Sequence, residues 1–588
     1  MTFNKYYQDE LTILRELGRE FAAVNPGLAP FLGSTGRDPD VERIMEGFAF
    51  LTGRLHQKLD DEFPEITHGL FNLLWPNYLR PVPSCAIVQY TPEAGLSQTQ
   101  LIPRGTRVES KEVDETSCVF TTIYDVEVSP IKLSQAILRE KEGRNILALR
   151  LDISGALLQD LTFKNLKFFL TGETALATNL YFTLLKKVES VKLAAYENDG
   201  FDRPFFTFGP EAIGPVGFDE QCAMLPYPSN TFPGYRLLQE YCCFPEKFMF
   251  LELTLPQSPG ECVPEKFAER ESFELQFYLK ELPPQAELVR AENFRLFCTP
   301  VVNLFRYDSA PLLITRKQTE YRIVPDPRHP VNYAVYSVDR VLSWAHNSKS
   351  EVEYAAFESF EHGRRAGQVP GYYRLKVRPS LTDEGTETYI TIIHPENETA
   401  PATETISLEL TCTNRMLPMN LSVGDICRQT DDSPQNVSFK NITPLSGSYA
   451  PPLGGDLPWR LISNMSLNYI SLVDVKALRT VVSTYDFRAL HDKRRARILA
   501  RNLEGLVKVD SRPTDRIYKG LPLRGARTYL TVNQEAFVGE GDMFLFCSLI
   551  NEFLALYATV NSFHELIVTE EKRGEQYKWP ARLGLEML

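Results

Sequence analysis

The 588-residue sequence lacks the features typical of exported or membrane proteins. Its longest apolar runs, such as Met543 to Phe546, fall far short of the roughly 20 residues that span a bilayer. The ten cysteines show no paired spacing, and the N-terminus MTFNKYYQDEL has no apolar stretch that could serve as a secretory signal. These absences predict a cytoplasmic protein with no direct membrane insertion.

The sequence also has no excess of positive charge. Lys and Arg number 63 against 76 Asp and Glu, which gives a formal net charge of -13 and argues against nucleic-acid binding. The most basic run, His491 to Arg501, lies on a predicted helix, where a solvated face explains it better than a phosphate contact. We therefore expect no nucleic-acid partner.

Catalytic and metal-binding motifs are missing as well. Gly520 to Gly525 has the glycine spacing of a phosphate-binding loop, but Ala526 and Arg527 replace the required Lys and hydroxyl residue. The adjacent Cys242 and Cys243 are more typical of buried thiols than of a zinc site. No residue is assigned a catalytic, cofactor-binding or metal-binding role, so a non-enzyme without a cofactor is predicted. The alternative is a cytoplasmic enzyme or ligand-binding protein whose site forms only in three dimensions.

What the sequence does contain begins with an N-terminal helical module at residues 1–84. Apolar residues at helical spacing predict a helix over Lys5 to Val24, and Asp38, Pro39 and Asp40 mark the start of another. We expect the apolar stripe of this second helix to be buried, although docking of a partner on part of the surface is equally consistent with the pattern. The stripe consists of Val41, Ile44, Met45, Phe48, Leu51, Leu55 and Leu59.

Residues 85–300 and 301–415 form two predicted β-rich regions. Phe273, Leu275, Phe277 and Leu279 alternate with polar residues, which predicts a strand with one apolar face and one face toward solvent. Residues 201–264 are rich in Pro, Gly and aromatic residues and are predicted to be loops pinned by aromatic side chains. Sandwich or barrel-like packing is expected for these regions.

The C-terminal part is predicted to be an irregular linker at 416–458 followed by an α+β domain at 459–588. Apolar residues from Phe546 through Phe553 and Tyr557 to Val560 predict a helix with Asn551 and Glu552 off its apolar side. The expected fold class is therefore α+β and multi-domain: a helical N-terminal module, β-rich middle domains and an α+β C-terminal domain.

Several uncommon strings lie in order along the chain. The N-terminal strings are YYQDELTILRELGREFA, DPDVERIMEGFAFLTGRL, LDDEFPEI and LWPNYLRPVPS. The later strings are TPVVNLF, YRIVPD, VYSVDRV, KNITPL, WRLISNMSLNYISL and FLALYATVNSFHEL. Together these strings resemble segments of the TssF family of the bacterial type VI secretion system. Little between Tyr90 and Pro300 contributes to the resemblance.

The resemblance implies a structural subunit of a baseplate wedge, similar to wedge proteins of contractile-tail phages. It implies two copies of this chain per TssG, with TssK, TssE and the baseplate hub as further partners. It also implies a location at the inner face of the cell envelope when the baseplate is docked, where the wedge holds tube and sheath and transmits the contraction trigger.

Interfaces often use aromatic and Arg anchors, so we expect protein contacts at three segments, with packing in the fold core as the alternative. The expected interface residues are Tyr6, Tyr7, Leu11, Leu14, Trp459, Arg460, Asn468, Tyr469, Phe553 and Tyr557.

Overall fold

The computed structural model separates the chain into two compact units, Met1–Leu73 with Pro452–Ser463, and Leu74–Pro451 with Asn464–Leu588. We refer to the first as the helical unit and to the second as the body. The structure describes residues 2–25, 27, 39–60, 64–141, 143–196, 202–228, 231–315, 317–345, 351–357, 371–380, 385–394, 403–430, 432–453, 461, 474–518, 520–558 and 562–584.

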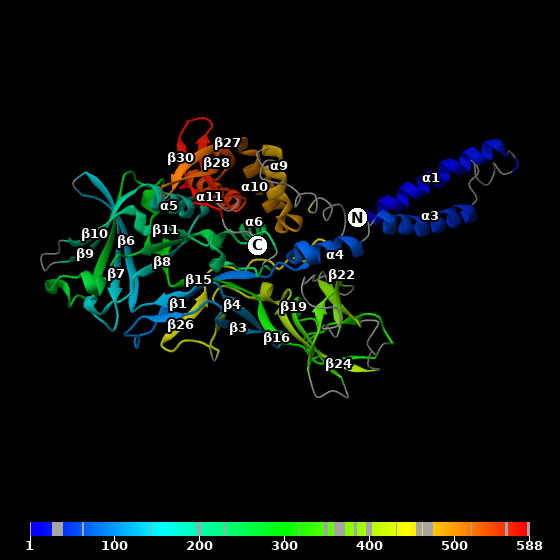
Figure 1. Cartoon of the computed structure of the whole chain (residues 1–588), viewed down its shortest axis with the longest axis horizontal. Coiled ribbons are helices and arrows are strands. Elements are labelled where there is room, and N and C mark those ends of the chain that lie inside the picture. Colours follow the sequence, from blue (N-terminus) through cyan, green and yellow to red (C-terminus); the bar gives the residue numbers. More distant parts are fainter. Residues whose placement is uncertain are drawn as a thin grey trace. The chain divides into compact units, whose positions relative to one another are not determined.

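The helical unit contains the two helices that the N-terminal pattern predicts, and a third helix links it to the body. Helix α1 spans Thr2–Val24, α3 spans Pro39–Asp60, and α4 spans Pro64–Leu74. Helices α1 and α3 lie side by side (Figure 1). Asp40 and Glu42 lie in the first turn of α3, where negative charge offsets the partly positive helix N-terminus.

The expectation that the apolar stripe of α3 is buried is wrong for three of its seven residues, whereas Val41 and Met45 are half-buried and the side chains of Leu55 and Leu59 lie outside the described part of the structure. Ile44, Phe48 and Leu51 are 72%, 55% and 61% exposed. The side of α3 that is buried carries Ala49 and Gly53 instead, with Glu42 half-buried beside them. Small residues let two helix backbones approach closely, so α3 packs through Ala49 and Gly53 and leaves Ile44, Phe48 and Leu51 exposed.

A six-stranded antiparallel sheet organises the body, and its strands come from widely separated parts of the sequence (Figure 1). Strand β1 pairs with β15 on one edge and with β26 on the other. The strand order is β25 (Ile426–Arg428), β3 (Arg107–Val113), β4 (Thr116–Thr122), β15 (Cys298–Val302), β1 (Cys85–Pro92) and β26 (Val437–Asn441). Residues 416–458, expected to be irregular, thus supply two strands of this sheet.

Two further sheets and a short strand pair fill the region up to residue 296. A five-stranded sheet contains β6 (Ile131–Lys141), β7 (Arg144–Ile153), β9 (Val188–Tyr196), β10 (Asp202–Phe208) and β13 (Ser272–Leu279). A four-stranded sheet contains β8 (Asn165–Leu170), β11 (Ile213–Val216), β12 (Phe250–Thr254) and β14 (Phe294–Leu296). Strands β2 (Gln100–Ile102) and β5 (Val126–Val128) pair separately.

The strand at 273–279 is buried on both faces, contrary to the prediction of one solvated face. It is β13, which lies between β7 and β9, so neither edge is free. Glu274 and Gln276 on the polar face are buried, and Gln276 donates to Glu274 at 2.9 Å while Arg139 pairs with the same carboxylate at 2.8 Å. These partners make burial of polar side chains tolerable, and period-two alternation alone does not reveal them.

The aromatic region at 201–264 is more regular than predicted. It holds three of the strands named above, β10, β11 and β12. It also holds helix α6 (Pro233–Cys243) and the single-turn helix α7 (Pro259–Cys262). Pro233 stands in the first turn of α6, where a missing N–H costs nothing, so this proline starts a helix instead of breaking one.

Two antiparallel-rich sheets make up the second β-rich region. One contains β16 (Phe305–Asp308), β17 (Leu312–Ile314), β19 (Ala334–Ala345), β20 (Val352–Glu353) and β24 (Glu404–Thr413). The other contains β18 (Tyr321–Arg322), β21 (Ala355–Ala356), β22 (Tyr372–Pro379) and β23 (Thr386–Ile393). They share one apolar core that includes Val341, Ile390 and Ile406.

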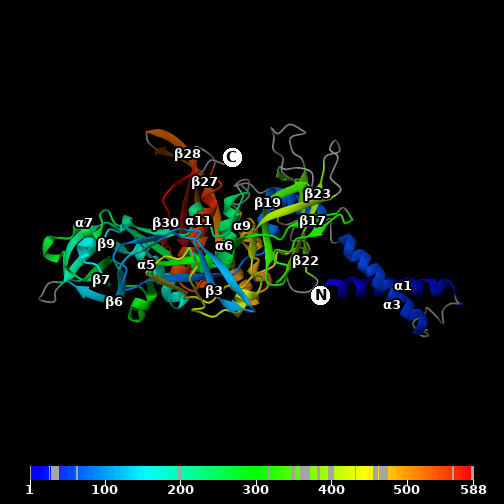
Figure 2. The ribbon, with the colours of Figure 1, turned by 90° about the horizontal axis from the view of Figure 1, so that it is seen from below.

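The C-terminal part is α+β, as predicted. Its sheet contains β27 (Leu506–Tyr518), β28 (Leu521–Val532), β29 (Ser562–Glu570), β30 (Gln576–Lys578) and β31 (Arg582–Leu583), and the long β27–β28 hairpin is seen in orange in Figure 2. Its helices are α9 (Val475–Thr484), α10 (Lys493–Glu504) and α11 (Glu540–Ala555).

Helix α11 is enclosed on all sides, including at Asn551 and Glu552, which were predicted to lie off its apolar face. It packs against helix α5 (Thr174–Lys186), α6 and strand β29. A Cβ at Gly541 would lie 2.1 Å from the Thr178 carbonyl oxygen, so only glycine permits this close approach to α5. The predicted α+β multi-domain class, with helices first and β-rich regions in the middle, is confirmed.

Candidate protein interface and a buried polar network

The contact between α1 and α3 is antiparallel and tight. A Cβ at Gly53 would lie 3.1 Å from the Tyr7 backbone nitrogen, near the start of α1 and toward the end of α3. At the other end, Arg15 Nε donates to Glu42 Oε1 at 2.9 Å, which joins the middle of α1 to the first turn of α3. Leu11, Ala22 and Ala49 are buried. We call this pair of helices the hairpin.

Each helix of the hairpin carries a row of exposed apolar side chains next to its buried positions. Phe21 of α1 directly precedes the buried Ala22, and Phe48 of α3 directly precedes the buried Ala49, an offset of about 100° of helical rotation in each helix. Because the helices are antiparallel, the same rotation on both brings the two rows to one face. We call it the apolar face, and it consists of Ile13, Leu17, Phe21 and Val24 of α1 with Ile44, Phe48 and Leu51 of α3, all exposed.

The structure places the predicted N-terminal interface residues beside this face. Tyr6, Tyr7 and Leu14 are half-buried, whereas Leu11 is buried and supports the hairpin itself. Periodicity identified the correct helices but did not say which of several apolar rows would be covered. Trp459, Arg460, Asn468 and Tyr469 lie outside the described residues.

The predicted C-terminal residues, Phe553 and Tyr557, belong to an aromatic cluster of the body. Phe553 is fully buried, and Tyr557 lies just beyond the end of α11 with its ring centroid 4.4 Å from that of Phe232 and 5.3 Å from that of Phe553. Phe553 therefore serves the fold core, which was the alternative expectation, and its side chain offers no surface to a partner.

A second aromatic cluster attaches the LWPNYLR segment to the body. The Trp75 ring centroid lies 5.0 Å from that of Tyr485, and Tyr485 stacks on Tyr235 of α6 at 4.7 Å. Trp75 Nε1 donates to Tyr227 Oη at 2.9 Å, and Tyr227 Oη donates to Gln239 Oε1 at 2.7 Å. Residues from three distant parts of the sequence thus meet here.

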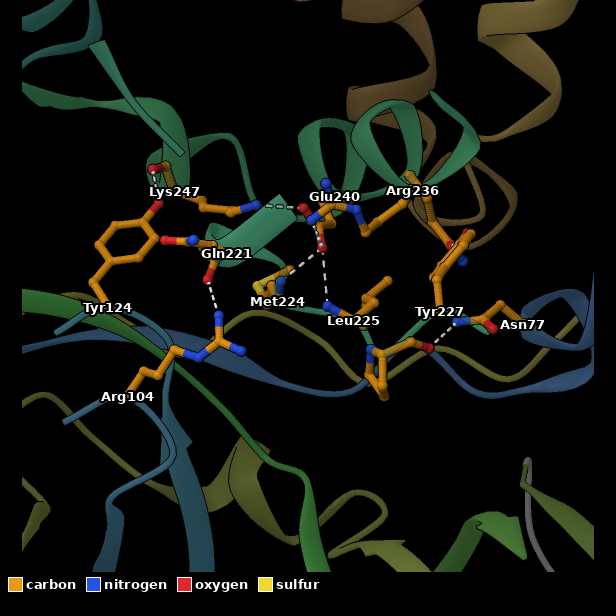
Figure 3. A network of polar contacts seen from close by, with 12 residues as sticks. Asn77, Arg104, Tyr124, Gln221, Met224, Leu225, Tyr227, Arg236, Glu240 and Lys247 are labelled. Atoms are coloured by element: carbon orange, nitrogen blue, oxygen red, sulfur yellow. Dashed lines mark hydrogen bonds and ion pairs between the residues drawn. The ribbon is translucent and has the colours of Figure 1, made fainter. Parts of the chain in front are cut away.

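Next to this cluster lies a buried network of three charged side chains (Figure 3). Glu240 and Lys247 are completely buried, and Arg236, one turn before Glu240 on α6, is nearly so. Lys247 Nζ donates to Glu240 Oε2, and Arg236 NH1 lies 3.9 Å from Glu240 Oε1. Burial lowers the pKa of Lys247, and the Glu240 carboxylate opposes that shift.

The Glu240 carboxylate also holds a loop in place. Its Oε1 accepts from the backbone N–H groups of Met224 and Leu225, at 2.8 and 2.9 Å. Tyr124 Oη donates to the Lys247 carbonyl oxygen at 2.8 Å, and burial raises the pKa of Tyr124 well above its usual value. Because every partner of Glu240 belongs to the fold, we assign this network a structural role.

Sequence reasoning did not identify this network. Arg236 and Glu240 are four residues apart on a helix, which is a recognisable ion-pair spacing, but such pairs are usually exposed. The Lys247 partner lies beyond the end of α6, so no periodicity connects it to Glu240. The Cys242 and Cys243 thiols are buried as predicted, and burial raises the pKa of both, which favours the neutral thiol.

The described residues contain no group of three or more His, Cys, Asp or Glu side chains placed to hold a metal ion. Over the same residues, none of the helices is both long and apolar enough to cross a membrane. What the described surface does offer is the apolar face of the hairpin.

Comparison with known proteins agrees over nearly the whole chain. The family model "Type VI secretion system, TssF" matches residues 1–586. The type VI secretion system component TssF1 of Pseudomonas aeruginosa is 30% identical over an alignment that covers 99% of this chain and 98% of that protein.

Solved structures give the same result. A chain of the TssK-TssF-TssG baseplate subcomplex, solved by cryo-electron microscopy, superposes with a TM-score of 0.75 at 29% identity, covering 92% of this chain and 99% of that chain. A chain of the type VI secretion system baseplate complex superposes with a TM-score of 0.67 at 25% identity and full coverage of both. The chain therefore belongs to the TssF family, the structural components of the type VI secretion system baseplate.

Proposed function

We propose that this chain assembles with TssG- and TssK-type subunits into a baseplate wedge, and that the apolar face of the hairpin is its contact with helices of the TssG-type partner. The observation that carries the proposal is seven exposed apolar side chains on one face of two packed helices. Burying one large apolar side chain contributes roughly 1.5–3 kcal/mol, so covering this face is a strong driving force for association.

The kind of partner follows from the geometry. Two antiparallel helices present a groove between them, and another amphipathic helix fills such a groove with its own apolar row. Tyr6, Tyr7 and Leu14, half-buried next to the face, extend the contact at the start of α1. Trp459, Arg460, Asn468, Tyr469 and Tyr557 remain predicted contacts. A second copy of this chain, TssE and the hub are further proposed partners, together with the role in holding tube and sheath and transmitting the contraction trigger.

The experiment is to co-express this chain with a TssG-type subunit and measure the absolute mass of the product by light scattering during size-exclusion chromatography. A single peak with the mass of two copies of this chain and one partner is expected. Separate elution of two folded proteins at their own masses would contradict the wedge assembly.

Variants locate the contact. The double substitution Leu17→Glu with Phe48→Glu places charge on the apolar face and is expected to abolish the complex, while the free chain keeps its fold because both side chains are already exposed. Leu101→Glu is the matched control, since Leu101 is equally exposed, at 58%, but lies on β2 of the body. A complex lost in both variants, or in neither, would argue against this surface.

A further inference from the structure

A groove of about 630 Å³ in the body carries an unusual distribution of charge. It lies where the six-stranded sheet meets strand β16. Three arginines line it: Arg104 in the loop after β2, Arg107 at the start of β3, and Arg306 on β16. Glu220 is the acidic residue among its lining side chains.

The positive charge of these arginines is not neutralised within the described part of the chain. All three are exposed, and none has a carboxylate of a described residue within ion-pair distance. The exposed Arg340 offers a contrast, because it pairs with Glu409 at 2.8 Å and with Glu353 at 3.4 Å. In a chain of net charge -13, a concave site with uncompensated arginines attracts anions.

The floor of the groove is apolar. Ile123, Met224 and Phe305 line it, and little of each side chain is exposed. A floor of this kind does not suit a phosphate backbone, which is charged throughout, but it accommodates one or two apolar side chains between carboxylates. Guanidinium groups bind carboxylates through two parallel hydrogen bonds, so the rim recognises Asp or Glu side chains.

The floor is held rigid by the buried network. The Met224 backbone N–H is one of the two that donate to Glu240 (Figure 3). Arg104 donates to the carbonyl oxygen of Gln221 at 2.5 Å, and Gln221 precedes Met224 by three residues. This contact also appears in Figure 3. A groove that is already formed before binding loses little conformational entropy when a ligand enters.

We infer that this groove binds an acidic segment of the TssG-type partner, with Asp or Glu side chains on Arg107 and Arg306 and an apolar side chain on the floor. The inference rests on the proposed function, because it takes the partner from it. It adds a second contact, on the body, that differs from the hairpin contact in being driven by charge.

The test uses the full-length chain co-expressed with the TssG-type subunit. Arg107→Glu with Arg306→Glu reverses the rim charge and is expected to weaken partner binding at least ~10-fold, measured as a dissociation constant, with the loss diminishing at high salt. The control is Arg494→Glu with Arg497→Glu, two exposed arginines of α10, which changes the net charge equally and is expected to alter binding less than 2-fold.

A cross-linker identifies the occupant. With p-benzoylphenylalanine at position 221, an exposed residue that contributes only its backbone carbonyl to the Arg104 contact, we expect a cross-link to an acidic stretch of the TssG-type subunit. A cross-link to a second copy of this chain, or wild-type affinity in the charge-reversed variant, would overturn the inference. If the wild-type chain forms no complex at all, the proposed function itself has failed, which is a different result.

Discussion

The hairpin and the core of the body distribute their side chains in opposite ways. The apolar face of the hairpin exposes seven apolar side chains, whereas the body encloses Arg236, Glu240 and Lys247. Each arrangement is costly unless a partner is present, because apolar surface favours burial and a buried charge requires a counter-charge. The body supplies its own partners through hydrogen bonds and ion pairs. For the hairpin we propose that the partner is another chain, so the buried groups of the body would contribute to folding and the exposed groups of the hairpin to binding.

The largest effect is expected from breaking the buried charge network. Glu240→Ala leaves two cations buried without their anion and two backbone N–H groups without an acceptor, so we expect a loss of about 3–5 kcal/mol in the free energy of unfolding. Urea denaturation of the free chain measures it.

A second variant keeps this prediction testable if Glu240→Ala does not fold. Lys247→Met combined with Glu240→Leu removes both charges of this pair together, so the double variant is expected to keep a cooperative urea transition even where Glu240→Ala has none. Loss of the transition in the double variant as well would contradict the prediction. Glu409→Gln, at an exposed pair with Arg340, is the control and should leave the urea midpoint unchanged.

A second prediction concerns pH and the interior of the body. His564 on β29 is buried, and burial lowers its pKa to about 4, below the usual 6.5. The unfolded state therefore binds a proton at a higher pH than the folded state, so stability falls as pH decreases from about 6.5 to about 4, by up to ~3 kcal/mol. His564→Gln should remove this part of the pH dependence. Parallel stability curves for both proteins between pH 7 and pH 4 would contradict it.

A third prediction separates the two sides of α1. Leu11→Ala creates a cavity at a buried position and is expected to destabilise the hairpin by about 2 kcal/mol, seen as faster amide hydrogen exchange in α1 and α3. Leu17→Ala, six residues later but on the apolar face, should leave exchange in the free chain unchanged and weaken the complex instead. The comparison between hairpin and body would break down if Leu17→Ala accelerated exchange as much as Leu11→Ala does.

The smallest effect concerns how fast the cysteine thiols of the folded body react with a thiol reagent. Cys427 is exposed and is expected to react with a thiol reagent within seconds to minutes, whereas the buried Cys242 and Cys243 should react only after unfolding. Mass spectrometry of the labelled peptides measures this. Early labelling of Cys243 would show that the region around α6 opens more easily than its buried charges suggest.

Local patterns predicted most helices and many strands, because these elements depend on neighbours in sequence. Asp38 to Asp40 marked the start of α3, and the alternating residues at 273–279 marked β13. The environment of each element was harder to predict. The second face of β13 is buried as well, and there Glu274 pairs with Arg139 from β6, which lies 135 residues away in the sequence.

The candidate site shows the same division. The apolar residues of the hairpin were visible in the sequence, but which of them face solvent depends on how Gly53 lets α1 and α3 approach. Arg104 and Arg107 lie close together in the sequence, but Arg306 comes some two hundred residues later, and only the fold brings it to the same groove.

The six-stranded sheet has a consequence for the synthesis of the chain. Strand β1 needs β15 and β26 as neighbours. Ser84, the residue before β1, donates a hydrogen bond to the carbonyl oxygen of Ser446, which is 362 residues away. At 5–20 residues per second, a ribosome takes roughly 20–70 s to deliver that second neighbour. During this interval β1 has an unpaired edge, and contacts of such long range form slowly. The nascent chain is thus expected to depend on chaperones until β26, the last strand of this six-stranded sheet, emerges.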